Sequence, residues 1–253
     1  MAAAGNALAT LVGDNFCARQ RLHAERWPGG VHEVRDGVLL VRLPGAEQLQ
    51  TAFATGFASH PLETARRWYG DDQFSLWLPA GSSTDGHLVS EEVAGMAADL
   101  LDTAIDSPPR PQLRIELVDG AQVRDDYVAV MLGFEIPNDV INNLFPLELF
   151  TAPGATGFVG YFEDLPATCC WTLRTGDVVG LYGVMTASEH RRQGLLRELL
   201  VRATGDARAA GCRHAVTQTA TAERAFAPLG FREVCRYDVV TGATGSTPHP
   251  SRT

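Results

Sequence analysis

The sequence predicts an α/β protein, and three observations support this fold class. Of the 253 residues, 45% are hydrophobic and 20% are charged, which is typical of a globular chain with a substantial core. Strand-like and helical patterns alternate from residue 113 to residue 240. Among them, an apolar strand-like run at Asp177–Thr186 leads through a short polar turn into a strongly helical run at Leu195–Ala210. This region therefore combines both kinds of element.

The first 110 residues contain three predicted elements. Gly37–Leu43 and Phe74–Leu78 have the apolar character of strands. Leu88–Ile105 has apolar residues at helical intervals, which predicts an amphipathic helix. Arg67–Gly70 is not followed by an apolar helix, and we interpret it as a surface turn. Met1–Asn15 lacks a basic start followed by a long apolar segment, so we expect no signal peptide there.

A domain boundary is predicted near residue 110. Asp106–Pro111 has three prolines in four positions, and these end any helix there. The predicted organisation is a first domain at residues 1–110, a second domain at residues 111–241 and a disordered tail at residues 242–253. The tail prediction follows from its high content of Gly, Ser, Thr and Pro.

The second domain is predicted to alternate strands and helices throughout. The predicted strands are Leu113–Val118, Phe158–Phe162, Cys169–Leu173, Asp177–Thr186, His214–Thr217 and Phe231–Val240. The predicted helices are Val123–Phe134, Asp139–Leu144, Leu195–Ala210 and Ala220–Ala227. Gly211 stands where the C-terminus of a helix favours glycine, which supports the end of the longest helix.

The turn Glu189–Leu196 is the most informative segment of the chain. A glycine at a strand-to-helix turn lets backbone N–H groups converge on an anion at the positive end of a helix. Arg191, Arg192 and Arg197 form a local basic island in a chain whose formal charge is −9. The alternative is that this segment is an exposed helix N-terminus, where the arginines only contribute to solubility. The acidic balance of the whole chain favours the anion site.

Two blocks in this order resemble the GCN5-related N-acetyltransferase (GNAT) family. The first is Leu181–Thr186 followed by His190–Gly194, and the second is Ala225–Phe231, similar to the family's Tyr-x-x-x-Gly-Phe block. The resemblance implies a GNAT fold with a mixed, mostly antiparallel sheet flanked by helices. It also implies a two-part chain, whose N-terminal α/β part is similar to a degenerate copy of the same fold.

The resemblance implies a coenzyme A site. The pyrophosphate would lie against the turn, formed here by Arg191, Arg192, Gln193, Gly194, Leu195 and Leu196. A bulged strand would pair its backbone with the pantetheine arm through Val184, Met185 and Thr186. Thr219 and Phe226 occupy positions where the family often has Asn and Tyr. Leu196 departs from the family's small residue, and Phe226 has no proton to give a departing thiolate.

The implied activity is transfer of the acetyl group of acetyl-CoA, as co-substrate, to a primary amine by direct attack in a ternary complex. A base must remove a proton from the amine, and the candidates are Tyr182 and Glu135. Instead of acting as a base, Tyr182 could be an aromatic residue packed in a strand, and Glu135 could be a solvated residue at the end of a helix. Phe226 and the lack of an obvious base also leave open an inactive acyl-CoA-binding or regulatory protein.

Composition limits the partners. A charge of −9 and a pI near 5.2 disfavour nucleic acid and anionic membranes, and mildly favour a cationic acceptor such as a small-molecule or peptide amine. The five cysteines lack C-x-x-C spacing and the seven histidines lack metal-ligand spacing, so we expect reduced thiols, no metal and a cytoplasmic protein. Cys169-Cys170 is interpreted as core rather than as a nucleophile. A homodimer is left open.

Overall fold

The computed structural model describes residues 2–56, 58–84, 86–101, 113–133, 136–221 and 223–242. The predicted boundary at 106–111, the predicted catalytic Glu135 and all but the first residue of the predicted tail lie outside the described residues. In the described part of the chain, no helix is long and apolar enough to cross a membrane.

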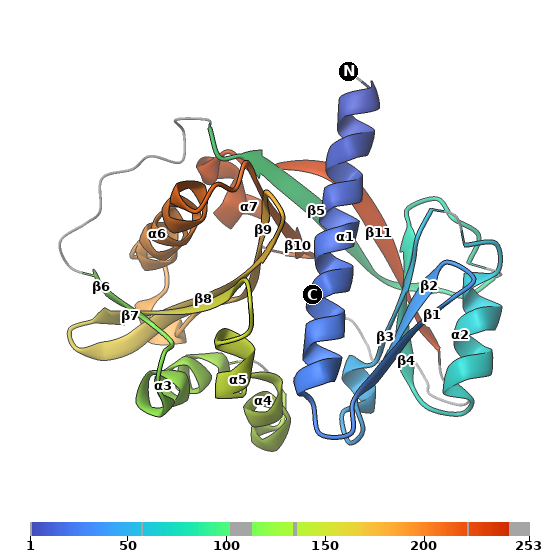
Figure 1. The fold of residues 1–253 in the computed structure, drawn as a ribbon, viewed down its shortest axis with the longest axis horizontal. Helices are drawn as coiled ribbons and strands as arrows, with labels where there is room; N and C mark the ends of the chain where they lie inside the picture. The colour runs from blue at the N-terminus through green and yellow to red at the C-terminus, as the bar shows by residue number, and fades with distance from the viewer. Residues whose placement is uncertain are drawn as a thin grey trace.

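The strands form one sheet in the order β1-β2-β3-β4-β11-β5-β10-β9-β8-β7-β6 (Figure 1). Their bounds are β1 Val31–Arg35, β2 Val38–Arg42, β3 Thr51–Ala54, β4 Phe74–Pro79, β5 Val89–Asp99, β6 Leu113–Leu117, β7 Ala155–Phe162, β8 Leu165–Thr175, β9 Val178–Thr186, β10 His214–Thr219 and β11 Arg232–Gly242. The β3–β4 and β9–β10 pairs are parallel, and the other pairs between described strands are antiparallel. This confirms a mixed, mostly antiparallel sheet.

Helices flank the sheet, as predicted. Their bounds are α1 Ala2–Arg26, α2 Pro61–Tyr69, α3 Ala121–Met131, α4 Asn138–Leu144, α5 Leu147–Phe150, α6 Leu195–Ala209 and α7 Glu223–Phe226, with 3₁₀ turns at Glu47–Leu49, Ser188–His190 and Ala227–Leu229. The strands and longer helices predicted after residue 113 are confirmed within a few residues at their ends, as are β2 and β4 in the first part.

The predicted helix at Leu88–Ile105 is wrong in its described part, because Val89–Asp99 forms strand β5, while residues 102–105 lie outside the described residues. Its residues from Val93 to Ala98 are all buried, since β5 lies between β10 and β11 and both faces of the sheet are covered there. A strand buried on both faces has a continuous apolar run instead of alternation, and such a run also matches helical spacing. β5 thus places a strand of the predicted first domain inside the sheet of the second.

Helix α1 and the segment around Arg67 also differ from the sequence interpretation. The 25-residue helix α1 was not predicted, because its residues do not form a single apolar stripe. It runs through the middle of the molecule between the part with β1–β4 and the part with α3–α5 (Figure 1). Arg67 belongs to helix α2 instead of a surface turn.

The two faces of the sheet carry separate cores. Along β8 and β9, Cys170 and Leu181 face α6, whereas Trp171 and Tyr182 face α3–α5, as strand alternation requires. The cysteines in the described residues are free, and the Cys169 and Cys170 thiols are fully buried, with raised pKa values because burial disfavours the thiolate. Their placement supports core packing over a nucleophile.

Candidate functional site

Strand β9 has a bulge at the centre of the site. Tyr182 pairs with Trp171 and Met185 pairs with Cys169, so two residues of β9 stand opposite one residue of β8. Gly183, one of the two, has a φ of 53°, and a Cβ there would collide with the Tyr127 hydroxyl. Glycine is therefore needed at this position for both its conformation and its small size.

The bulge lies where β9 separates from β10. Their parallel pairing ends at Gly180 and Val216, and the Thr217 hydroxyl then donates a hydrogen bond of 3.0 Å to the Leu181 carbonyl. Beyond this point, no described residue of β9 pairs with β10. The result is an opening between two strands, bordered by the bulged backbone.

The turn after β9 leads into α6 through two left-handed residues. Arg192 has a φ of 64° and Gly194 has a φ of 82° at the N-cap of the helix. The first N–H groups of a helix have no partner within the helix, so the start of α6 can donate hydrogen bonds to an anion. Arg191 is exposed, and its Nε donates to the Thr186 carbonyl at 3.2 Å, which holds the turn against the strand.

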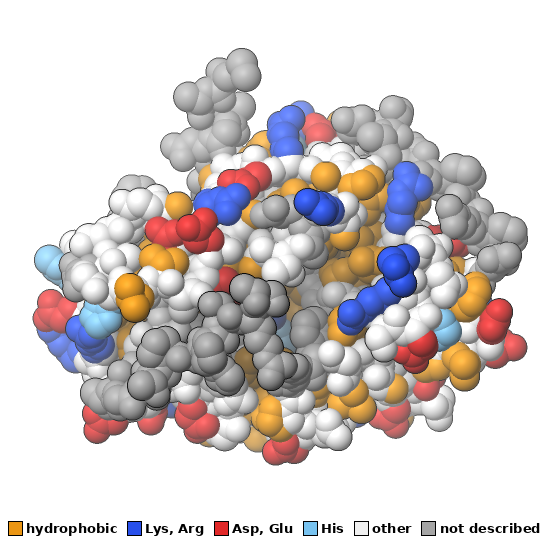
Figure 2. Space-filling view, turned by 180° about the vertical axis from the view of Figure 1, so that it is seen from behind, with side chains coloured by type: hydrophobic (Ala, Val, Ile, Leu, Met, Phe, Trp, Pro, Cys, Tyr) orange, Lys and Arg blue, Asp and Glu red, His pale blue; other side chains and the backbone are white. Residues whose placement is uncertain are grey.

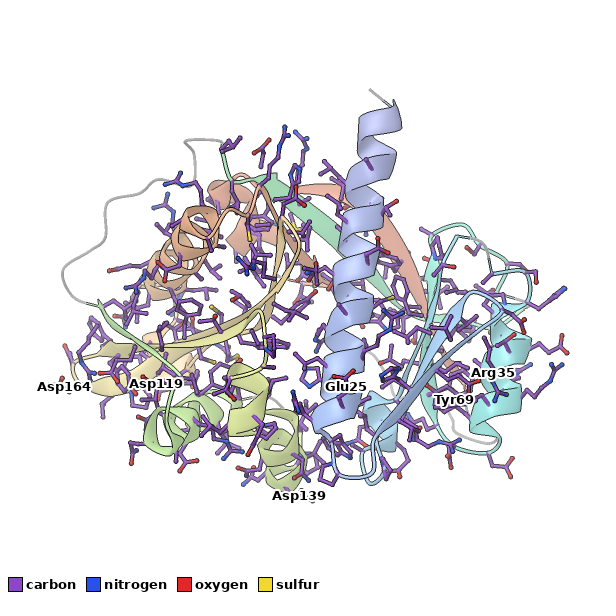
Figure 3. The ribbon with its side chains drawn as sticks, in the orientation of Figure 1. Glu25, Arg35, Tyr69, Asp119, Asp139 and Asp164 are labelled. Atoms are coloured by element: carbon purple, nitrogen blue, oxygen red, sulfur yellow. The ribbon has the colours of Figure 1, made fainter. Side chains whose placement is uncertain are left out.

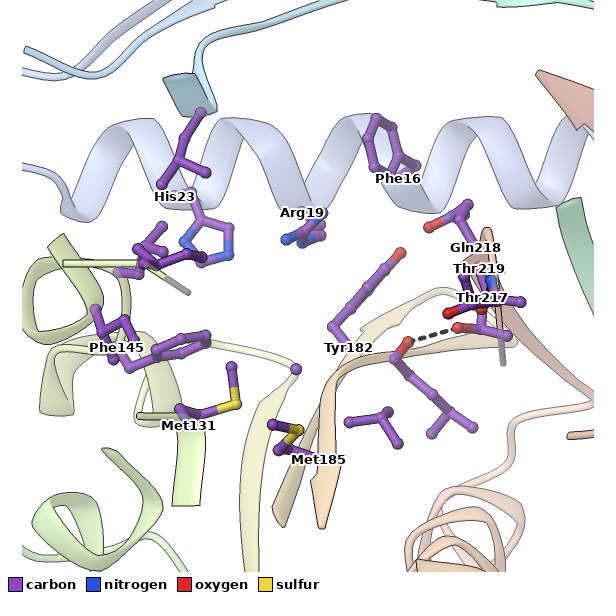
Figure 4. Close-up of a pocket in the computed structure, with 18 of the residues that line it drawn as sticks. Phe16, Arg19, His23, Met131, Phe145, Tyr182, Met185, Thr217, Gln218 and Thr219 are labelled. Carbon is purple, nitrogen blue, oxygen red and sulfur yellow. Dashed lines mark hydrogen bonds between the residues drawn. The ribbon is translucent and has the colours of Figure 1, made fainter. Parts of the chain in front are cut away.

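A cavity of about 980 Å³ joins this turn to the middle of the molecule (Figure 4). Its walls come from β9, β10 and the turn, from α3 and α4, and from α1 with β3 and β4. Figure 2 shows one face of the molecule hollowed at its centre, with apolar surface inside the hollow and basic side chains at its rim. The space is large enough for two ligands to approach each other.

The cavity brings together nearly all the described residues that the sequence singled out. They are Tyr182, Val184, Met185, Thr186, Arg191, Arg192, Gly194, Leu195, Leu196, Thr219 and Phe226. Gln193 is not among the lining residues. Leu195, next to the N-cap, is buried in the core, whereas Leu196 is half-buried at the cavity wall.

Tyr182 combines the two interpretations that the sequence left open. It is 5% exposed and packed against Trp171, yet its side chain borders the cavity. Its hydroxyl donates to Asn15 Oδ1 on α1. Burial raises the pKa of Tyr182 above its ordinary value of 10, so the phenol is neutral near pH 7. A neutral phenol can orient a ligand but does not remove a proton from an amine at that pH.

Phe226 and Thr219 border the end of the cavity near β10. Phe226 is 2% exposed and meets Phe231 edge-on, with ring centroids 5.4 Å apart. Among the three predicted pantetheine residues, Met185 directs its carbonyl toward β8, where it accepts a hydrogen bond of 2.7 Å from the Thr168 hydroxyl. Val184, the other residue of the bulge, has no partner residue in β8.

Residues 137–231 match the sequence model of the acetyltransferase (GNAT) family. This part of the chain belongs to the GNAT family. A search of curated protein sequences found no match. The GNAT domain contains the bulge, the turn and helix α6, so the resemblance read from the sequence is confirmed for the region that carries these features.

Solved structures extend the likeness in fold to most of the chain. A GCN5-related N-acetyltransferase from Kribbella flavida is 17% identical, covers 92% of this chain and 96% of its own, and has a TM-score of 0.68. A tandem GNAT protein from the clavulanic acid biosynthesis pathway is 16% identical, covers 90% and 88%, and has a TM-score of 0.61. A GCN5-related N-acetyltransferase from Sphaerobacter thermophilus is 15% identical, covers 83% and 81%, and scores 0.56. The two-part architecture fits these folds.

One wall of the cavity was missed by the sequence analysis. Phe16, Arg19, Gln20 and His23 project into it from α1, outside the GNAT domain. Their spacing of three, four and seven residues places them on one helix face. The spacing alone could have indicated a helix. However, Arg19, Gln20 and His23 are polar, so this face lacks the apolar stripe that predicts an amphipathic helix.

His23 is the most enclosed polar group on this wall. It is 4% exposed, and its Nε2 is buried without a hydrogen-bond partner in the described structure. Burial, and then the nearby Arg19, lower the pKa of His23 well below its ordinary value, so the imidazole is neutral near pH 7. Its ring meets Trp171 edge-on at 5.4 Å. Among the described residues, no group of three or more His, Cys, Asp or Glu could hold a metal ion.

Proposed function

We propose that this protein transfers the acetyl group of acetyl-CoA to a primary amine by direct attack in a ternary complex. The single observation that carries the proposal is the continuous path from the Gly194 turn, past the bulge in β9, to the cavity wall formed by α1. One end of this path suits the cofactor and the other end suits an acceptor. GNAT membership of residues 137–231 supports the same reaction class.

The turn fits the pyrophosphate of coenzyme A. The N–H groups at the start of α6 would donate to the phosphates, and Arg191 and Arg192 would supply positive charge in an otherwise acidic chain. The backbone of Val184 and Thr186, along the separated edge of β9, would pair with the pantetheine arm, whereas the Met185 carbonyl is held by the Thr168 hydroxyl on β8. Thr219 and Phe226 would contact the same arm from the opposite side of the opening.

The chain's own groups then place the thioester and the amine. Backbone N–H groups near Val184 would hydrogen-bond to the thioester carbonyl and stabilise the negative charge that develops on its oxygen. Holding both reactants in one cavity converts a bimolecular encounter into an oriented attack. We assign Tyr182 an orienting contact, because its neutral hydroxyl is held by Asn15. The proposal of Glu135 as base rests on sequence alone.

An acyl-CoA-binding protein without turnover is the second candidate, and Phe226 favours it. The departing thiolate receives no proton from a phenylalanine, and this ring is buried against Phe231. In an active enzyme, either water would protonate the departing thiolate or the thiolate would leave without a proton.

Calorimetric titration with acetyl-CoA, followed by a search for amine-dependent release of the coenzyme A thiol, tests the proposal. Micromolar binding with amine-dependent thiol release is the expected result. Binding without thiol release for any amine would favour the second candidate. Absence of binding would contradict both.

A further inference from the structure

Arg19 holds a fixed position in the cavity. Its guanidinium carbon lies 5.0 Å from the centre of the Tyr182 ring and 5.6 Å from the centre of the Phe16 ring (Figure 4). Two aromatic rings in this arrangement orient a guanidinium through its planar faces. The helix beneath it is anchored, because Asn15 Nδ2 donates to the Leu173 carbonyl at 3.1 Å and to the Thr175 hydroxyl at 2.8 Å.

The positive charge of Arg19 has no anionic partner in the described structure. Its Nε is buried without a hydrogen-bond acceptor, and no described carboxylate lies within 4.0 Å of its nitrogens. Burial lowers the pKa of Arg19, but a guanidinium stays protonated at neutral pH. The Arg19 side chain is half-buried, and a partly desolvated cation without a counter-charge is destabilising, so binding an anion here would be favourable.

The charges around Arg19 favour an anion from outside the chain. Among the described residues that line the cavity, Glu91 is the only acid, and its side chain is exposed on β5. Asp139 and Asp164 lie at the edge of the molecule in Figure 3. The described cavity wall thus carries one exposed acid against the basic side chains of Arg19, Arg191 and Arg192.

We infer that the acceptor of the proposed acetyl transfer is an amine that carries a carboxylate, and that Arg19 binds this carboxylate. The inference rests on the proposed function and adds the substrate class to it. It reverses the mild expectation of a cationic acceptor, because a ligand responds to the charges within the cavity more than to the net charge of the chain.

A carboxylate fits better than a phosphate group. One guanidinium matches the single charge and the two oxygens of a carboxylate in a bidentate pair. A phosphate dianion would leave one charge uncompensated, because the neighbouring His23 is neutral. His23 Nε2, four residues along the same helix face, can exchange a hydrogen bond with a second polar group of the acceptor. The pyrophosphate of the cofactor has its own arginines at the turn, on a different element.

The test uses matched acceptors and matched variants. L-amino acids differ from their C-terminal amides in the carboxylate and in a more basic α-amine, so the acid-to-amide ratio of kcat/KM, measured by thiol release from acetyl-CoA, is compared between variants. The variants are Arg19→Met, which removes the charge, and Arg19→Lys, which keeps the charge but lacks the planar guanidinium that forms a bidentate pair. Arg67→Met is the control, because Arg67 is an exposed arginine that pairs with Glu63 on α2 outside the cavity.

We expect at least one amino acid to react with a kcat/KM about tenfold to a hundredfold above that of its amide, as charged hydrogen bonds of this kind contribute. Arg19→Met should lower this ratio about tenfold to a hundredfold, Arg19→Lys should lower it less, and Arg67→Met should match the wild type. A ratio that Arg19→Met leaves unchanged would overturn the inference.

Two controls separate this inference from the proposed function. Calorimetry with acetyl-CoA should give the same affinity for Arg19→Met and wild type; a lost affinity would assign Arg19 to the cofactor and overturn the inference. Thermal unfolding with N-acetyl-L-amino acids and their amides needs no cofactor. Stabilisation by the acids alone, lost in Arg19→Met, supports the carboxylate site even if acetyl-CoA does not bind. No stabilisation and no turnover with any acid would overturn it.

Discussion

Two parallel β–α–β units stand in different parts of this sheet, and only one has the features of an anion site. In the C-terminal unit, β9 passes through the Gly194 turn to the 15-residue helix α6 and then to β10. In the N-terminal unit, β3 leads through residues 55–60 to the nine-residue helix α2 and then to β4. Both units pair their strands over three positions.

The difference lies in the turns. The C-terminal turn has two arginines and two left-handed residues, Arg192 and Gly194, and it borders the cavity. The N-terminal turn at residues 55–60 contains no arginine, and none of its described residues borders the cavity. β3 and β4 nevertheless supply part of the cavity wall through Thr51 and Trp77. The same connectivity therefore gives a turn suited to an anion in one unit and only part of the cavity wall in the other, depending on one short turn.

The largest expected effect is the loss of acetyl-CoA binding in Gly194→Glu. The substitution places a carboxylate where the pyrophosphate would lie and forces a larger residue into a left-handed conformation. Calorimetry should show an affinity lowered more than about a hundredfold. Gly56→Glu, in the exposed turn of the N-terminal unit, should leave the affinity unchanged. Equal affinities for both variants would contradict the assignment of the turn.

Gly183→Ala should destabilise the fold by about 3 kcal/mol, because the added methyl group collides with the Tyr127 hydroxyl and the residue keeps a positive φ. Urea unfolding measures the change. Gly176→Ala, with a φ of 63° and open space around its Cβ, should cost about 1 kcal/mol from backbone strain alone. Similar losses in the two variants would show that the close contact at the bulge adds nothing.

Arg192→Ala should weaken acetyl-CoA binding about tenfold at low salt and less at high salt, because an exposed charge is screened by ions. Titrations at two salt concentrations measure this difference. Arg67→Ala, on the helix of the N-terminal unit, should have no effect at either concentration. A salt-independent loss at Arg192 would indicate a structural cause instead of charge.

Phe226→Tyr should raise turnover a few-fold, up to about tenfold, because a hydroxyl at this cavity wall can give a proton to the departing thiolate. The buried hydroxyl should also lower the free energy of unfolding by about 1 kcal/mol. Phe74→Tyr is the matched control, since Phe74 is also 2% exposed but packs in the N-terminal unit away from the cavity. It should lose stability without any gain in turnover.

The parts of the fold that could be predicted are those whose signals are local. Leucines at helical intervals, with a glycine before them and Gly211 after them, predict helix α6. The same reasoning was wrong for β5. This strand lies between β10 and β11 and is buried on both faces, so its sequence lacks the alternation of apolar and polar residues that predicts a strand. Helix α1 was missed because polar residues such as Asn15, Arg19 and His23 interrupt any apolar stripe along it.

By itself, the sequence determined the strand, turn and helix that we propose as the cofactor half of the candidate site. The strand, the turn and the start of the helix from Leu181 to Leu196 are contiguous in sequence, so the residue types and their order predict the local geometry. Only the tertiary structure decided the proposed acceptor half, where Arg19 meets Tyr182 across more than 160 positions of sequence. Which face of α1 turns inward depends on how distant surfaces pack, and packing of this kind leaves no pattern within one segment of the chain.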